Sequence, residues 1–433
     1  MNLHRRSQVI LQWIGLGCAV GVACGLASAV FLMLLDRATH FRIDHEVIVY
    51  TLPVGGLLIG LIYERWGQGI KGGNNLVLDT IHDDSKQIPI RMAPMVLVGT
   101  VLTHLFGGSA GREGTAVQMG ASLADALAHR LKLHHEGRRQ LLAAGIAGGF
   151  GSVFGTPIAG MLFGLEVVWV GRIEYHALLP ALAAAIVGDF VTRACGIVHT
   201  PYPVVPFEAM SPLLALKWLA FGVCVAATST AFVELTHRLK RALETRIPRL
   251  PIRMMVGGLA VVVMWRLIGT SDYLGLGVPF IVRAFVDPTQ PPYAFAAKLV
   301  FTAVTLSAGF LGGEVTPLFF IGATLGATLG RVMGIPIELA AGVGLAGVFA
   351  AAANTPIALS IMAVELLGPS VMPHVVIVCV VAYLITGHRG IYPAQRLTRF
   401  KTGHRDLNPA VPLRDTHTVA NPDDRARTIP PQA

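Results

Sequence analysis

The stretch TPIAGMLFGLE at residues 156–166 decides the fold, because the chain repeats it as TPIALSIMAVE at residues 355–365. Upstream, GREGT at residues 111–115 has a counterpart in GGEVT at residues 312–316, again roughly 200 residues away. An internal repeat of this kind in an apolar chain predicts a transporter built from two similar halves. Its site is then expected where the halves meet, near the middle of the bilayer.

The composition is that of a protein that crosses a membrane several times. Hydrophobic residues make up 53% of the 433 residues and charged residues only 14%, against roughly 25% charged residues in soluble domains. Several apolar segments are shorter than the roughly 20 residues that a full span needs. These segments predict broken helices whose ends line a cavity inside the membrane, where a helix N-terminus suits an anion.

The formal net charge of +9 resides in the connections between apolar segments. Basic stretches at residues 5–6, 129–139, 237–253 and 396–405 are predicted to face the cytoplasm. Aromatic residues do not alternate with these charges as they do on nucleic-acid-binding surfaces, so we expect no nucleic-acid partner. The five cysteines lack metal-like spacing, and the sequence predicts neither a metal site nor a cofactor.

We divide the chain into three parts. Residues 1–206 are predicted to form the first membrane repeat and residues 207–392 the second. Residues 393–433 are predicted to form a polar cytoplasmic tail without order. The arginines at 5–6 and the sequence LASA at residues 26–29 resemble a signal peptide with a small-residue cleavage site, but the apolar run is long. We therefore favour an uncleaved first span, with both termini in the cytoplasm.

Four glutamates interrupt apolar or glycine-rich sequence, and the repeat pairs them. Glu113 is the counterpart of Glu314, and Glu166 is the counterpart of Glu365. An ionisable group at membrane depth is costly, so each of the four is a candidate functional residue. The alternative is a structural glutamate that caps a helix or lies at the membrane interface.

Two function classes outside anion transport are also compatible with parts of the sequence. Residues 107–111 read GGSAG and match the G-x-S-x-G pattern of serine hydrolases, which would make Ser109 a nucleophile. We expect no enzyme, because no strand precedes this motif and His104 has no acid to orient it. The repeat alone would also permit a proton-coupled carrier for organic solutes.

Three motifs resemble the anion motifs of the CLC family of chloride channels and anion/proton antiporters. They are GREG at residues 111–114, GGEVTP at residues 312–317 and GIYP at residues 390–393. The resemblance covers nearly the whole chain and implies an all-α polytopic membrane protein with about eighteen tilted and broken helices in two inverted-topology repeats. It also implies a homodimer with one pore in each subunit.

Several departures from the family pattern resemble its bacterial fluoride/proton antiporter branch. Thr115 replaces the proline of GREGP, while Glu314 and Thr316 replace the isoleucine and alanine of GGIFAP. The first motif reads GGNNL at residues 72–76 and lacks the anion-contacting serine of the family. Val167 occupies the position at which chloride/proton antiporters carry their internal proton-transfer glutamate.

The resemblance therefore implies an antiporter that exports fluoride across the inner membrane in exchange for protons. It makes Glu113 the external gate and proton acceptor, and we consider Glu314 the candidate inner proton or anion partner. Fluoride is small and strongly hydrated, so its binding site needs good hydrogen-bond donors. The expected anion-binding residues are Gly73, Asn74, Asn75, Gly114, Thr115, Val315, Thr316 and Tyr392. The alternative within the family is a chloride channel or chloride/proton exchanger.

Overall fold

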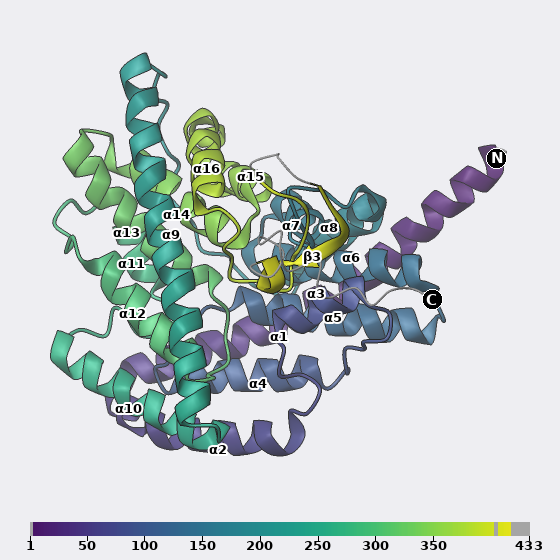
Figure 1. The fold of residues 1–433 in the computed structure, drawn as a ribbon, viewed down its shortest axis with the longest axis horizontal. Helices are drawn as coiled ribbons and strands as arrows, with labels where there is room; N and C mark the ends of the chain where they lie inside the picture. Colours follow the sequence, from purple (N-terminus) through teal and green to yellow (C-terminus); the bar gives the residue numbers. More distant parts are fainter. Residues whose placement is uncertain (1–2, 402–405, 417–433) are drawn as a thin grey trace, which may run out of the picture.

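The computed structural model describes residues 3–401 and 406–416, and these residues form a nearly all-helical protein (Figure 1). The helices of the first half are α1 (Leu3–Asp44), α2 (Leu52–Trp66), α3 (Asn74–His82), α4 (Met92–Leu105), α5 (Glu113–Arg130), α6 (His135–Phe154), α7 (Pro157–Glu166) and α8 (Leu178–Ala194). The helices of the second half are α9 (Pro212–Arg246), α10 (Leu250–Ile268), α11 (Val278–Arg283), α12 (Ala294–Ser307), α13 (Val315–Met333), α14 (Ile337–Ala353), α15 (Pro356–Leu367) and α16 (Met372–Thr386). Four short 3₁₀ helices and three strands complete the described chain.

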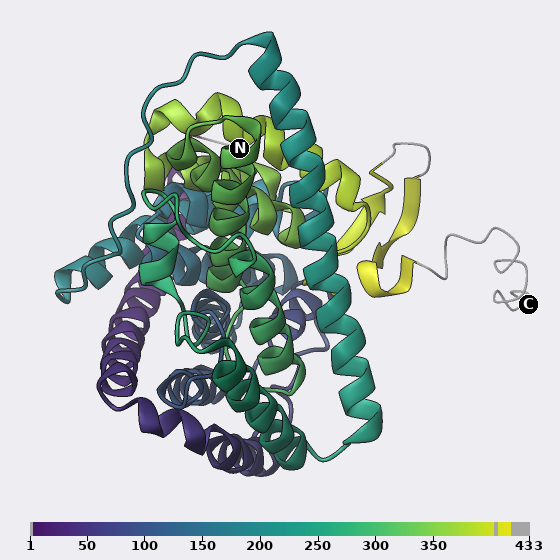
Figure 2. The same cartoon turned by 90° about the vertical axis from the view of Figure 1, so that its left-hand side faces the viewer.

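The two sets of eight helices follow the same packing plan. In the first half α1 packs along α8 and α5 packs on α6, and in the second half α9 packs along α16 and α13 packs on α14. Helices α7 and α15 meet across the boundary between the halves. Figure 2 shows α9, in teal, as a long rod along the outside of the second half. The repeat in the sequence is therefore a repeat of helix packing as well.

Long membrane spans and short helices coexist, as the lengths of the apolar segments predicted. Seven segments within the described residues are long and apolar enough to cross a membrane. They are Ser7–Asp44, Glu46–Trp66, Tyr175–Ala194, Pro212–Arg246, Leu250–Ile268, Val315–Met333 and Pro369–Thr386. In contrast, α3, α7 and α15 have 9, 10 and 12 residues. These three are too short to span a hydrocarbon core of about 30 Å.

The break between α6 and α7 is built in the same way as the break between α14 and α15. Gly155 ends α6 in the left-handed conformation at a φ of 74°, and Asn354 ends α14 in that conformation at a φ of 58°. Pro157 and Pro356 then occupy the first positions of the short helices, where a missing N–H group removes no helical hydrogen bond. The repeated TPIA sequence is therefore a start signal for a helix inside the protein.

Glu166 and Glu365 cap each other's helices. The Glu166 carboxylate, at the end of α7, accepts hydrogen bonds from the N–H groups of Ile357 (3.1 Å) and Ala358 (2.7 Å), at the start of α15. The Glu365 carboxylate, at the end of α15, accepts hydrogen bonds from the first N–H groups of α7, at 3.0 and 2.7 Å. Each carboxylate lies where the partial positive charge of a helix N-terminus stabilises it. For these two glutamates the structural interpretation, a helix cap, describes the contacts.

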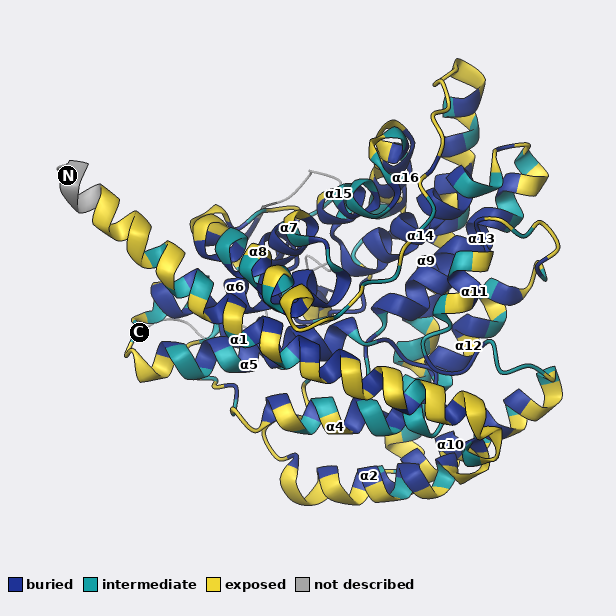
Figure 3. Ribbon diagram, turned by 180° about the vertical axis from the view of Figure 1, so that it is seen from behind, coloured by how far each residue is buried: buried dark blue, intermediate teal, exposed yellow. Residues whose placement is uncertain are grey.

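Glycines allow the central helices to touch backbone to backbone. A Cβ atom on Gly120 of α5 would lie 2.2 Å from the carbonyl oxygen of Gly145 in α6. A Cβ atom on Gly322 of α13 would lie 2.2 Å from the carbonyl oxygen of Gly344 in α14. Figure 3 shows these helices largely in the buried colour, whereas α1 and α2 alternate buried and exposed residues. Close packing of small residues is a common way to join helices in lipid.

The structure corrects the prediction that the tail from residue 393 lacks order. Strand β1 (Trp169–Val170) pairs in parallel with β2 (Arg396–Arg399), which pairs antiparallel with β3 (Asp406–Pro412). Leu397, Leu407 and Leu413 pack with Val170 in a small apolar cluster. The prediction was wrong because it rested on the polar composition of the tail, in which these leucines are few and widely spaced. Residues 402–405 and 417–433 lie outside the described residues.

An ion pair ties this tail to α3. The guanidinium of Arg414 lies 2.9 Å from the Asp79 carboxylate, and the Lys86 ammonium lies 3.1 Å from it. Partial burial acts to raise the pKa of Asp79. Hydrogen bonds from Arg414 and Lys86 act to lower it, and together they outweigh the effect of burial, so the pKa lies below its usual value. The pair therefore stays charged at neutral pH and holds the C-terminal strands close to the helix that begins at Asn74.

Candidate functional site

A pair of backbone hydrogen bonds joins the two copies of the glycine-rich motif. The N–H group of Gly111 donates to the carbonyl oxygen of Gly313 at 2.6 Å, and the N–H group of Gly313 donates to the carbonyl oxygen of Gly111 at 2.8 Å. Helices α5 and α13 begin two residues after these glycines. Gly312 lies at a φ of 148°, and a Cβ atom there would come within 2.4 Å of the Ala110 Cβ atom. The bridge thus brings two helix N-termini together inside the protein, and it requires glycine.

Glu113 reaches from the first turn of α5 to the N-terminus of α13. Its side chain is fully buried. Oε1 accepts a hydrogen bond from the Thr316 hydroxyl at 2.5 Å, and Oε2 accepts hydrogen bonds from the Thr316 N–H group and the Arg112 N–H group, both at 3.1 Å. The Arg112 Nε atom lies 3.4 Å from Oε1. The carboxylate therefore occupies the place that an anion would take at this helix N-terminus.

Glu314 occupies the equivalent position in the sequence but has different surroundings. Its Oε2 atom is buried and has no hydrogen-bond partner among the described residues. Glu314 lines a cavity of about 270 Å³, the Glu314 cavity, together with Asn74, Thr115 and Tyr392. The Thr115 hydroxyl is paired with the Thr100 hydroxyl at 2.7 Å instead of with a glutamate. The two glutamates of the repeat therefore differ: one is bonded at a helix N-terminus and one faces a cavity.

The two neighbouring asparagines of the first motif have separate roles. Asn75 Oδ1 accepts a hydrogen bond from the N–H group of Ala394 at 3.1 Å, so this side chain holds the chain that follows Tyr392. Asn74 has a buried Oδ1 atom without a partner among the described residues. A Cβ atom on Gly114 would lie 3.0 Å from Asn74 Nδ2, so glycine lets this amide approach the N-terminus of α5. The Asn74 amide nitrogen, a hydrogen-bond donor, therefore lies beside the N-terminus of α5.

The predicted anion-binding residues lie in two places, on the wall of the Glu314 cavity and at the helix starts next to the bridge. The cavity is lined by Gly73, Asn74, Asn75, Thr115 and Tyr392. Thr316 bonds the Glu113 carboxylate, as described above. Gly114 and Val315 are buried in the first turns of α5 and α13 and do not line the cavity. The structure therefore places five of the eight predicted anion-binding residues on the wall of the Glu314 cavity and the other three in the first turns of α5 and α13.

A second, very small cavity lies between Asn74 and Tyr392. Its volume is about 10 Å³, enough for one water-sized species. The rest of its wall is apolar and consists of Val77, Leu78, Val117, Ile146, Phe163 and Val167. Sequence reasoning did not identify Phe163, although it belongs to the short helix that TPIA begins. The ring of Phe163 stacks on that of Phe150 at a centroid distance of 4.2 Å, which fixes its position in the wall.

The surroundings of Ser109 are those of a structural hydroxyl. Its Oγ atom lies 3.0 Å from Thr302 Oγ1, and its N–H group donates to Thr305 Oγ1 at 3.2 Å. His104, which would serve as the base of a hydrolase, instead contacts the carbonyl oxygens of Thr100 and Ala110, at 2.8 and 2.9 Å. Ser109 therefore joins α12 to the loop before α5, and no histidine of the described residues bonds to its hydroxyl.

Comparison with known proteins gives one family. The family described as voltage gated chloride channel matches residues 55–387. Among curated proteins, a chloride/fluoride channel protein of Pseudomonas syringae pv. tomato is 48% identical over 415 residues, which cover 94% of this chain and 91% of that protein. An uncharacterized protein of Methanocaldococcus jannaschii is 26% identical over 394 residues, which cover 89% of this chain and 96% of that protein.

Solved structures agree in fold. The crystal structure of a CLC-type fluoride/proton antiporter superimposes with a TM-score of 0.87 at 36% sequence identity, covering 92% of this chain and all of that chain. A slow cyanobacterial Cl⁻/H⁺ antiporter superimposes with a TM-score of 0.77 at 17% identity, covering 86% of this chain and 94% of that chain. At that identity the second match concerns the fold alone.

Proposed function

The chain belongs to the CLC family of voltage-gated chloride channels, and on that premise we propose that it is a fluoride/proton antiporter. It is a multi-pass membrane protein and an anion transporter of that family. One observation carries the narrower proposal. The Glu113 carboxylate lies at the N-terminus of α13, where it accepts the hydrogen bonds of Thr316 that would otherwise serve an anion.

In this mechanism Glu113 is both gate and proton acceptor. While ionised, its carboxylate competes with the transported anion for the Thr316 donors. Protonation removes the competing charge and weakens the acceptor, so the side chain leaves the helix terminus and the anion takes its place. Because one group carries the proton and controls the anion, a cycle of protonation couples the two movements in opposite directions.

Glu314 is the proposed partner on the other side of the bridge. It lines a cavity that also contains Tyr392, and its buried Oε2 atom has no hydrogen-bond partner among the described residues, so a proton on this carboxyl would have a site to occupy. Val167, at the position of the internal proton-transfer glutamate in chloride/proton antiporters, cannot accept a proton. Glu314 would supply the acid that this position lacks.

The donors and the size of the site favour fluoride. Asn74, Tyr392 and Thr316 offer amide and hydroxyl donors to replace the hydration of a small anion. The cavity between Asn74 and Tyr392 has a volume of only about 10 Å³. The 48%-identical relative is named a chloride/fluoride channel protein, so a chloride channel or chloride/proton exchanger is the second candidate.

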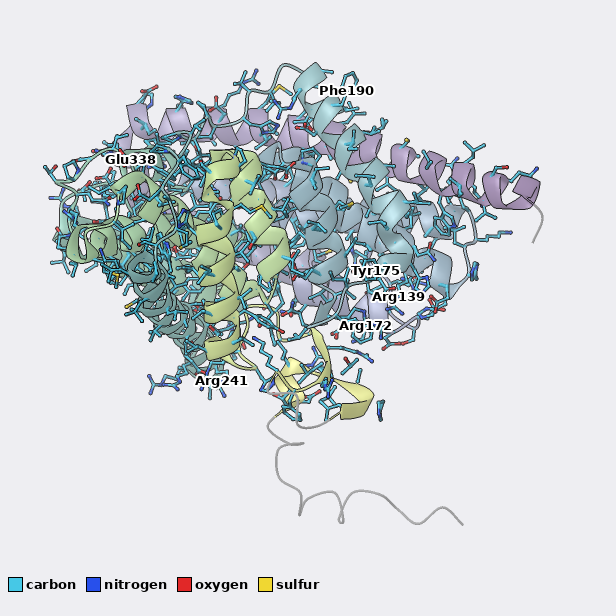
Figure 4. The ribbon with its side chains drawn as sticks, turned by 90° about the horizontal axis from the view of Figure 1, so that it is seen from above. Arg139, Arg172, Tyr175, Phe190, Arg241 and Glu338 are labelled. Carbon is cyan, nitrogen blue, oxygen red and sulfur yellow. The ribbon has the colours of Figure 1, made fainter. Side chains whose placement is uncertain are left out.

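We also propose a homodimer in an inner membrane, with both termini in the cytoplasm. Helix α8 carries exposed apolar side chains, including Phe190 at 70% exposure and Ile186 at 47%. These are suited to a contact with lipid or with a second subunit. In Figure 4, Arg139, Arg172 and Arg241 lie toward the side of the molecule that carries the C-terminal strands, as the positive-inside rule predicts for a cytoplasmic face.

Flux measurements on liposomes test the proposal. Purified protein is reconstituted into liposomes loaded with either fluoride or chloride, and anion efflux and proton uptake are recorded together. We expect fluoride efflux with proton uptake, and chloride efflux at least about tenfold slower, a difference of about 1.4 kcal/mol in barrier. Equal fluxes of the two anions would refute fluoride selectivity, and fluoride efflux without proton uptake would indicate a channel. Protein-free liposomes serve as the control.

A further inference from the structure

A large pocket reaches Arg112, the residue that contacts the Glu113 carboxylate, and shares no lining residue with the Glu314 cavity. This Arg112 pocket has a volume of about 740 Å³. Its walls come from the end of α1, the end of α10 and the loop that leads into α11, and they include Arg42, Arg112, Arg266 and Trp265. Because Arg112 contacts Glu113, an ion in this pocket lies on the route to the gate.

Arg42 is a buried cation without a partner in this pocket. It lies in the last turn of α1 and is only 5% exposed. Its Nε atom is buried and has no hydrogen-bond partner in residues 3–401 and 406–416. In the same residues no carboxylate lies within 4.0 Å of its guanidinium. A guanidinium at this depth is normally satisfied by hydrogen bonds or by an ion pair. The Arg42 guanidinium therefore lacks the acceptors that a buried cation usually has.

A buried lysine lies close to Arg42. Lys298 of α12 is fully buried, and its ammonium donates to the carbonyl oxygens of Tyr273 (3.1 Å) and Gly275 (2.7 Å). Gly275 also contacts Arg42, because a Cβ atom at position 275 would lie 3.1 Å from a terminal nitrogen of that guanidinium. The ammonium therefore has carbonyl partners but no carboxylate within 4.0 Å among the described residues. Lys298 therefore lies behind Gly275 and is not part of the pocket wall.

The acidic residues of the pocket bond to groups other than Arg42. Asp36 lies 3.3 Å from His40, and Asp272 lies 2.8 Å from Arg283. Glu46, the acid that interacts with Arg42 at longer range, accepts a hydrogen bond from Ser271 at 2.6 Å. These contacts leave the Arg42 guanidinium without an acceptor among the described residues, and Arg112 Nε, in the same pocket, also has no hydrogen-bond partner there.

We propose that the Arg112 pocket binds an oxyanion at Arg42, separately from the transported halide. A guanidinium presents parallel N–H donors that match two oxygens of a sulfate, phosphate or carboxylate group. The pocket, at about 740 Å³, also accommodates a polyatomic anion, unlike the cavity of about 10 Å³ beside Tyr392. An oxyanion held there lies in the same pocket as Arg112, so it hinders passage of the smaller anion past Glu113.

Thermal unfolding of the purified protein tests this site without depending on transport. Sulfate at about 10 mM, compared with chloride at equal ionic strength, is expected to raise the unfolding temperature of the wild type by roughly 2 °C or more. Arg42→Met is expected to lose this shift. Arg266→Met is the matched control, since Arg266 lines the same pocket but is exposed, and it should keep the shift. An equal shift in Arg42→Met, or no difference between sulfate and chloride, would overturn the proposal.

Crystals of the wild type grown in selenate decide the question if Arg42→Met fails to fold. Selenium scatters anomalously, so a bound selenate is located directly. A peak within hydrogen-bonding distance of Arg42 supports the site. A peak only at other positions, or none, contradicts it.

Discussion

Glu113 and Glu314 start from the same repeated motif and end in different surroundings. In the backbone bridge Gly111 and Gly313 each donate one hydrogen bond and accept one, so the two copies have equivalent backbone contacts. Of the two glutamates, only Glu113 is bonded to the opposite helix. The difference originates in the threonines that follow. Thr316 is free to bond Glu113, whereas Thr115 is already paired with Thr100. A symmetrical backbone therefore carries an asymmetrical pair of acids, as an exchanger needs if one acid gates the anion and the other passes the proton.

The helices behind the bridge also differ in their hydroxyl contacts. Thr302 of α12 is the repeat counterpart of Thr100 of α4, and their hydroxyls have different partners. Thr100 bonds Thr115, but Thr302 bonds Ser109 from the first half of the chain. Thr302 therefore bonds to the other half of the chain, whereas Thr100 bonds within its own half.

Glu113→Gln is expected to have the largest effect on this comparison. The amide has no charge to be neutralised and cannot carry the proton, so coupled fluoride efflux should fall at least about 100-fold, the range of a lost proton-transfer group. Liposome efflux recorded with a fluoride electrode measures it. Glu365→Gln, which alters a helix cap of similar chemistry, is the control and should retain efflux. Exchange at the wild-type rate in Glu113→Gln would remove Glu113 from the mechanism.

Glu314→Gln separates the two acids. If Glu314 passes the proton, this variant should lose proton uptake by at least about tenfold while fluoride still moves, since Glu113 and its Thr316 donors are intact. Simultaneous recording of proton uptake and fluoride efflux gives the ratio. Fully coupled transport in this variant would contradict an inner role for Glu314.

The two threonines offer a smaller and sharper test. Thr316→Val removes the hydroxyl that bonds Glu113 and should slow exchange by about tenfold, the value of one hydrogen bond to a charged group. Thr115→Val breaks only the contact with Thr100 and should change the rate by less than about threefold. Equal losses in the two variants would show that both helix N-termini bind the anion in the same way.

The reciprocal caps should affect stability alone. Glu166→Ala and Glu365→Ala each leave two N–H groups without an acceptor at a helix start, at an expected cost of about 1–3 kcal/mol. Thermal unfolding measures the loss, and the two variants should be similar because their contacts are equivalent. A loss of proton coupling in correctly folded Glu166→Ala would show that Glu166 takes part in transport and is not only a helix cap.

The sequence predicted the parts of the fold that depend on local signals. TPIA starts a short helix because glycine or asparagine ends the helix before it and proline fits its first position. GREG and GGEVTP marked the two helix N-termini of the site. The bonding of Glu166 and Glu365 was left open between function and structure, because the N–H groups that each carboxylate accepts lie about 190 to 210 positions away.

Three features depend on contacts that no local pattern reveals. Asn74 and Asn75 are adjacent and chemically identical, and only the position of Ala394 distinguishes them. The order of the tail follows from burial of Leu397 and Leu413 beside Val170, residues too widely spaced to show a strand pattern. Arg42 and Lys298 belong to different halves of the chain, and no local sequence motif indicates that both lie next to Gly275.

The bridge between Gly111 and Gly313 has a consequence for the synthesis of the protein. At translation rates of about 5–20 residues per second, the roughly 200 residues that separate the two glycines take about 10–40 s to make. During that interval Gly111 has no partner for its N–H group, and Glu113 has no Thr316 to bond. The nascent first half must therefore protect this polar edge by contact with lipid headgroups, water or the insertion machinery until its second half emerges.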